Sequence, residues 1–171
     1  MSARAFHPTA ARLWRHIAPA ERLAAAVAFL REPPPDLFAS ALGAVARARH
    51  MRPQAARALA TDAQAQILAT VLDPGEALAQ GLLVALHLSE RRSLLVAFLD
   101  TLGLAHDEGI LKDEVEAPPV DGEKARAAVR ALQAFPFEHV ETYLNTLWLQ
   151  DPDRWAALPS AASLPDESAG D

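Results

Sequence analysis

The chain of 171 residues contains no cysteine. This absence excludes disulfides, thiolate metal sites and cysteine nucleophiles, and it fits a protein that works in a reducing compartment. Aromatic residues are also scarce, at 6%, so we expect a core of closely packed small helices. Arginine far exceeds lysine and alanine is abundant, a bias typical of bacterial proteins. We therefore expect a cytoplasmic protein of bacterial type.

Long uninterrupted hydrophobic runs are missing as well. The most apolar stretch, residues 77–103, is broken by the polar residues 89–92, which leaves two apolar arms too short to cross a bilayer. Near the amino terminus, Arg4, Arg12 and Arg15 interrupt the apolar segment that a signal peptide would need. The sequence therefore predicts neither a membrane span nor a secretion signal.

Start and stop signals predict an all-α fold of about eight or nine short helices. Prolines suit the first position of a helix, and Asp36, Ser89, Asp121 and Thr61 with Gln64 have the spacing of amino-terminal caps. Alternating β-branched or aromatic runs are absent, so we expect no strand. The predicted helices and helical turns span about residues 19–30, 37–50, 53–60, 62–72, 76–88, 90–102, 122–134, 136–150 and 152–158.

We expect these helices to form an irregular bundle, and a short α-solenoid-like stack of helix pairs is the alternative. Similar cap-and-helix segments recur at irregular offsets, which does not satisfy the test for true repeats. Residues 76–88 are apolar nearly all round, as is typical of a central helix. The predicted organisation is one helical domain over residues 1–158, followed by a disordered acidic tail at 159–171.

Charge is distributed unevenly along the chain. Residues 1–99 contain 11 arginines and 7 acids, whereas residues 100–171 contain 15 acids and 5 bases. Four arginines surround His50 within residues 47–57, a stretch without acids or aromatics. Nothing there could stack on a base and no recognition-helix pattern follows, so we do not favour nucleic acid. The cluster is either a solvated face or a charge that steers assembly with a partner or a second copy.

The connection from Leu104 to Val120 is long for two helices of a compact domain, and such connections are typically functional or disordered. Its apolar residues can hold it against the helices, and Gly109 can supply a positive φ for a tight turn. We therefore expect an ordered loop with its carboxylates facing outward. The apolar residues expected to hold it are Leu104, Ile110, Leu111 and Val115.

No metal or other cofactor is predicted. The acids before Gly109 are adjacent, whereas a calcium loop has alternating ligands, and neither HExxH nor paired Glu-x-x-His units occur. His87 lies in the expected central helix, where it is either a core histidine or part of an anion site with Arg91 and Arg92. The sequence assigns no catalytic residue.

The function predicted from these features is a non-catalytic protein-interaction or scaffold module that binds a protein partner or itself. The alternative is a small-molecule or metal-dependent enzyme that uses the 104–116 loop with His87, Arg91 and Arg92, and His106 as acid or base. Reversing Glu108 and Glu114 to Lys should weaken partner capture without changing the melting temperature appreciably. The predicted contact surface consists of Arg91, Arg92, His106, Asp107, Glu108, Asp113, Glu114 and Glu116.

Overall fold

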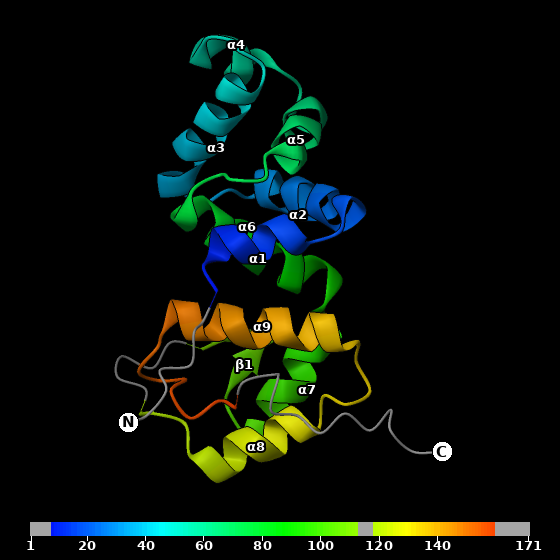
Figure 1. Ribbon diagram of the computed structural model, residues 1–171, viewed down its shortest axis with the longest axis vertical. Helices are drawn as coiled ribbons and strands as arrows, with labels where there is room; N and C mark the ends of the chain where they lie inside the picture. The colour runs from blue at the N-terminus through cyan, green and yellow to red at the C-terminus, as the bar shows by residue number, and fades with distance from the viewer. Residues whose placement is uncertain (1–7, 113–117, 160–171) are drawn as a thin grey trace. The chain divides into compact units, whose positions relative to one another are not determined.

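A computed structural model describes residues 8–112 and 118–159 of the chain, and these ranges are mostly helical (Figure 1). The all-α class of short helices is confirmed. The described chain divides into two compact units, which we call the N-terminal unit (residues 8–91) and the C-terminal unit (from residue 92). The single domain over residues 1–158 stays a prediction. The predicted acidic tail lies, except for Pro159, outside the described residues.

No helix in the described ranges has both the length and the apolar character that a membrane crossing requires.

The N-terminal unit is built around its last helix, α6, which packs against α1, α2 and α3. The buried side chains of α6 include Leu78, Leu82, Leu83 and Leu86, so the predicted central helix is confirmed within this unit. Burial of several leucines on one helix is the main source of stability for such a fold. The helices of the unit are α1 (Ala10–His16), α2 (Pro19–Arg31), α3 (Pro35–Ala48), α4 (Pro53–Ala58), α5 (Thr61–Thr70) and α6 (Glu76–Glu90).

Helix α1 was not predicted, and contacts far along the chain explain its presence. The Glu76 carboxylate accepts hydrogen bonds from the backbone N–H groups of Ala10 at 2.7 Å and Ala11 at 3.2 Å. The ring of Trp14 is fully buried, and its Nε1 donates to the Val71 carbonyl at 2.8 Å. Because seven residues are too few to form a stable helix alone, these distant partners determine α1.

The C-terminal unit has its core around Phe98 of α7. The ring of Phe98 meets Tyr143 edge to face at a centroid distance of 5.4 Å and Trp155 at 5.9 Å. Burial raises the pKa of the Tyr143 phenol, because the phenolate would lose its hydration. Helix α8 packs on α7. The elements are α7 (Arg92–Leu102), β1 (His106–Asp107), β2 (Ile110–Leu111), α8 (Gly122–Arg130) and α9 (Phe137–Gln150).

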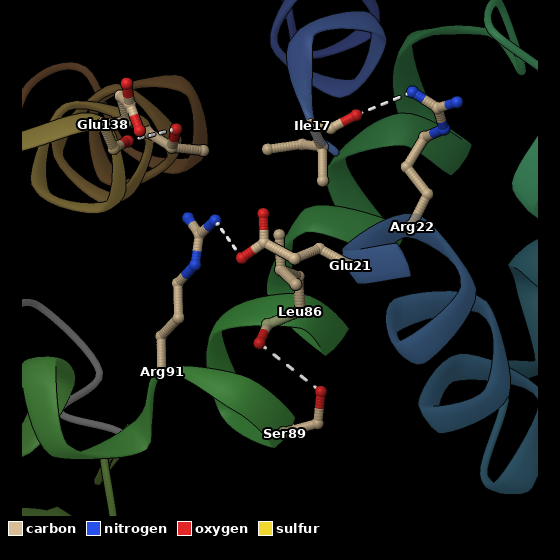
Figure 2. A network of polar contacts seen from close by, with 8 residues as sticks. Ile17, Glu21, Arg22, Leu86, Ser89, Arg91 and Glu138 are labelled. Carbon is tan, nitrogen blue, oxygen red and sulfur yellow. Dashed lines mark hydrogen bonds and ion pairs between the residues drawn. The ribbon is translucent and has the colours of Figure 1, made fainter. Parts of the chain in front are cut away.

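Of the predicted amino-terminal helix caps, the structure confirms Asp121 and shows that the others are wrong. Asp121 does cap α8, where its carboxylate accepts two backbone N–H bonds, and these bonds lower its pKa. Asp36 instead lies within the first turn of α3. The Gln64 side chain, expected in a capping box with Thr61, is buried and donates to a carbonyl of α4 at 3.0 Å. Ser89 lies inside α6 and donates to the Leu86 carbonyl at 3.4 Å (Figure 2).

Candidate functional site

The connection that follows α7 forms a small antiparallel hairpin, so the expectation of no strand is wrong at this place. His106 pairs with Leu111, and Asp107 pairs with Ile110. The two residues of the turn, Glu108 and Gly109, have φ angles of 46° and 93°. Two consecutive positive φ values define the tight turn that matches the twist of paired strands. The positive φ predicted at Gly109 is confirmed, whereas the one at Glu108 was not expected.

His106 ties the hairpin to α7. Its Nδ1 accepts the backbone N–H of Gly109 at 3.1 Å, and its Nε2 lies 3.0 Å from Oδ1 of Asp100. Because Nδ1 is an acceptor, the neutral ring carries its hydrogen on Nε2 and donates it to the carboxylate. Both ring nitrogens are therefore engaged within the protein. In this arrangement neither nitrogen can take a proton from a substrate.

The turn also lies directly on the surface of α7. A Cβ atom placed on Gly109 would lie 2.9 Å from the Cβ atom of Leu95, closer than side chains normally approach. Position 109 therefore requires glycine for two reasons: its backbone has a positive φ, and there is no space for a side chain. These contacts fix the hairpin relative to α7.

On its outer side the hairpin carries an exposed ion pair between Arg92 and Glu108. The two side chains are 48% and 71% exposed, and pairs of this kind contribute little to stability. Asp107 is exposed beside them, and so is Ile110, at 54%. The expectation that Ile110 holds the loop down is therefore wrong, because the pairing register turns this side chain outward. Leu104 and Leu111 are half-buried.

Arg91 does not share the surface position of its neighbour Arg92. It follows the last residue of α6 in the N-terminal unit, and its side chain is 4% exposed. Its Nη2 donates to Oε1 of Glu21 in α2 at 2.9 Å (Figure 2). Its Nε and Nη1 have no hydrogen-bond partner among the described residues. The charge of Arg91 is therefore buried, whereas that of Arg92 is exposed.

The remaining predicted residues belong to different units, and each is described within its own unit. His87 is buried in α6, within the N-terminal unit, whereas His106 belongs to the C-terminal unit. Within residues 8–112 and 118–159, no group of three or more His, Asp or Glu side chains could hold a metal ion. Asp113, Glu114, Val115 and Glu116 lie outside the described residues.

The sequence did not predict a second candidate binding site, a surface pocket in the N-terminal unit. A pocket of about 530 Å³ lies where α3 ends and the chain turns into α4. The sequence marked the basic residues of this region but gave no sign of a concave surface, because the pocket arises from how two helices meet. Its lining residues are Gly43, Ala46, Arg47, His50, Met51 and Pro53.

Comparison with known proteins gives no match for this chain: no family model, curated protein or solved structure is significantly similar to it.

Proposed function

We propose that the protein is a non-catalytic interaction module that binds a basic protein partner through the hairpin after α7. The observation that carries this proposal is the exposed Ile110 on a hairpin held firmly to α7. We define the hairpin surface as Arg92, Asp107, Glu108 and Ile110. Arg91 is left out because its side chain is buried.

The rigidity of the hairpin supports this role. Glycine packing at the turn and the two hydrogen bonds of His106 restrain the backbone before any partner arrives. A surface that is already ordered loses less conformational entropy on binding, which leaves more of the contact energy for affinity. An exposed aliphatic side chain among polar neighbours is also the usual composition of a small contact surface.

Charge determines the kind of partner. Residues 92–171 contain 15 acidic and 6 basic residues. On the hairpin the exposed Asp107 lies beside Ile110, and Glu108 is paired with Arg92. A partner with a small apolar depression surrounded by Lys or Arg would complement this arrangement, and its association would weaken as salt increases. We place the module in the bacterial cytoplasm, on the basis of its cysteine-free, arginine-rich composition.

The test is site-specific photo-crosslinking in cells, with a benzophenone amino acid at position 110. Position 72 is the matched control, because Leu72 is also exposed, at 44%, and belongs to the N-terminal unit. We expect a discrete adduct from position 110, none from position 72, and loss of the adduct when Asp107→Lys and Glu108→Lys are combined. The captured protein should have a basic surface.

Three results would contradict the proposal. Identical products from positions 110 and 72 would show that the hairpin has no special role. An adduct at position 110 that survives the double charge reversal would remove the electrostatic basis. An adduct formed only between copies of this chain would assign the surface to self-association instead. The Glu108→Lys and Glu114→Lys reversal proposed from the sequence is a further check on the same prediction.

The enzyme alternative has less support. It needs His106 as an acid or base, and both ring nitrogens are held by Asp100 and Gly109. Thermal unfolding with divalent metals, phosphate and nucleotides tests it, because a specific ligand at 100 times its Kd adds about 2.7 kcal/mol of stability.

A further inference from the structure

A second binding site is indicated in the N-terminal unit, apart from the hairpin surface, where α3 turns into α4. The backbone here forms a defined corner. Helix α3 closes with hydrogen bonds from Met51 N–H to the Ala46 carbonyl at 2.9 Å and from His50 N–H to the Arg47 carbonyl at 3.3 Å. Pro53 then begins α4. The pocket described above occupies this corner, where the two helices contact each other.

The Arg47 guanidinium lies over a glycine in the middle of α3. Gly43 lies one turn earlier, and a Cβ atom placed there would be 3.3 Å from Nη1 of Arg47. A larger residue at position 43 would require the end of the Arg47 side chain to move by a few tenths of an ångström. Glycine within a helix is destabilising relative to alanine. The absence of a side chain at Gly43 leaves space for the Arg47 guanidinium.

His50 lines the same pocket with an unusual backbone. Its φ is 51°, in the left-handed region where glycine is the common residue at the end of a helix. The His50 side chain is exposed, and both His50 and Arg47 line the pocket. Two nitrogen-donor side chains therefore line one open surface pocket, together with Gly43, Ala46, Met51 and Pro53.

The electrostatic environment favours an anion. Four arginines occur within residues 47–57, and no acid occurs in the sequence between Asp36 and Asp62. Within the part of the chain that the structure describes, none of the four forms an ion pair with a carboxylate. Their charge is thus not neutralised by these neighbours. The guanidinium fork matches phosphate oxygens in geometry as well as in charge. The four arginines are Arg47, Arg49, Arg52 and Arg57.

We propose that this pocket binds a small phosphate monoester, with Arg47 and His50 on the phosphate and Met51 and Pro53 against its apolar group. The limited volume of about 530 Å³ suits a small molecule. A nucleic acid strand fits less well, because residues 47–57 contain no aromatic side chain on which a base could stack.

The experiment is a titration of the full chain with inorganic phosphate and with phenyl phosphate, followed by amide chemical shifts and calorimetry. We expect saturable shifts confined to residues 43–53, and several-fold tighter binding of phenyl phosphate because the apolar walls contact its ring. Arg47→Gln should weaken binding about tenfold, the factor that corresponds to one charge-assisted hydrogen bond. Arg31→Gln is the matched control, because Arg31 is exposed in the same unit but does not line the pocket.

Gly43→Ala separates a binding role from a structural one. The added methyl group should displace the Arg47 guanidinium and weaken phosphate binding, while the higher helix propensity of alanine raises thermal stability. Opposite changes in affinity and stability support the site, because a variant that merely disturbed the fold would lower both.

Three results would overturn the proposal. Shifts that do not saturate would mean that no site exists. Equal weakening by Arg47→Gln and Arg31→Gln would show only a general effect of net charge. Tighter binding of a single-stranded oligonucleotide than of phenyl phosphate, with losses spread over Arg49, Arg52 and Arg57, would assign the surface to a nucleic acid strand.

Discussion

The carboxyl ends of α3 and α7 close with the same hydrogen-bond pattern. In α3 the bond that spans five residues runs from Met51 N–H to the Ala46 carbonyl at 2.9 Å, and in α7 the corresponding bond runs from Leu104 N–H to the Leu99 carbonyl at 3.1 Å. Each helix thereby satisfies carbonyl groups that would otherwise lack partners. The two ends differ in the residue that adopts the left-handed backbone.

At the end of α7 this residue is Gly103, with φ of 69°, and at the end of α3 it is His50, with φ of 51°. A Cβ atom at Gly103 would meet nothing within 4 Å, so its role is conformational. His50 adopts the same backbone with a side chain that lines a pocket. The end of α7 thus has the residue that best suits a left-handed turn. The end of α3 has a less favourable residue there, and the side chain of that residue lines a pocket.

The largest effect is expected from Gly109→Ala in the turn that follows α7. The variant combines an unfavourable positive φ with a contact to Leu95 that requires displacement, and together these should lower the free energy of unfolding by about 2–4 kcal/mol. Urea unfolding followed by circular dichroism, with tryptophan fluorescence of the variant Trp14→Phe to report on the C-terminal unit, measures the loss. A cost under about 1 kcal/mol would show that the hairpin is not held tightly on α7.

Gly103→Ala should have a smaller effect, because only the backbone conformation is unfavourable and the space around it is open. We expect a loss of about 1 kcal/mol, measured by the same unfolding experiment. If Gly103→Ala lowered the free energy of unfolding as much as Gly109→Ala, close packing against Leu95 would not explain the larger effect expected at position 109.

His50→Gly should change stability in the opposite direction. Relief of the left-handed backbone outweighs the added flexibility of glycine in the unfolded chain, and we expect a gain of about 0.5–1 kcal/mol. Phosphate affinity should fall at the same time. A destabilised variant would indicate that the histidine side chain serves the fold, and the contrast between the two helix ends would lose its meaning.

The smallest effect is expected from Glu108→Asn. Asparagine tolerates a positive φ better than glutamate, and the ion pair that is lost with Arg92 is exposed. We expect a gain of no more than about 0.5 kcal/mol, measured by thermal unfolding at low and high salt. A clear loss at low salt alone would show that the Arg92 pair contributes more than its exposure suggests.

Local signals were sufficient to predict much of the fold. Pro19 begins α2, Asp121 caps α8 and Gly103 closes α7, and each depends on residues within a few positions of itself. Two of the wrong caps, Gln64 and Ser89, failed for the same reason. Gln64 and Ser89 have polar side chains that found carbonyl partners elsewhere, in α4 and within α6 respectively. The spacing of residues in the sequence indicates which hydrogen-bond partners a side chain could have, but not which of them it binds.

The candidate sites were less accessible to sequence reasoning. Adjacency in the chain suggested that Arg91 and Arg92 act together, yet one side chain is buried with Glu21 and the other is exposed with Glu108. The turn at Gly109 was predictable, but the outward direction of Ile110 depends on the strand register. The pocket beside His50 required knowledge of how α3 meets α4.

The contact between Glu76 and the first turn of α1 has a consequence for the order of folding. During synthesis α1 leaves the ribosome long before the residue that completes its amino terminus has been translated, 66 positions later. Its seven residues are too few to remain helical in water alone. We therefore expect α1, the first helix of the described residues, to be among the last to form in the N-terminal unit, and its amides should exchange with solvent until α6 is in place.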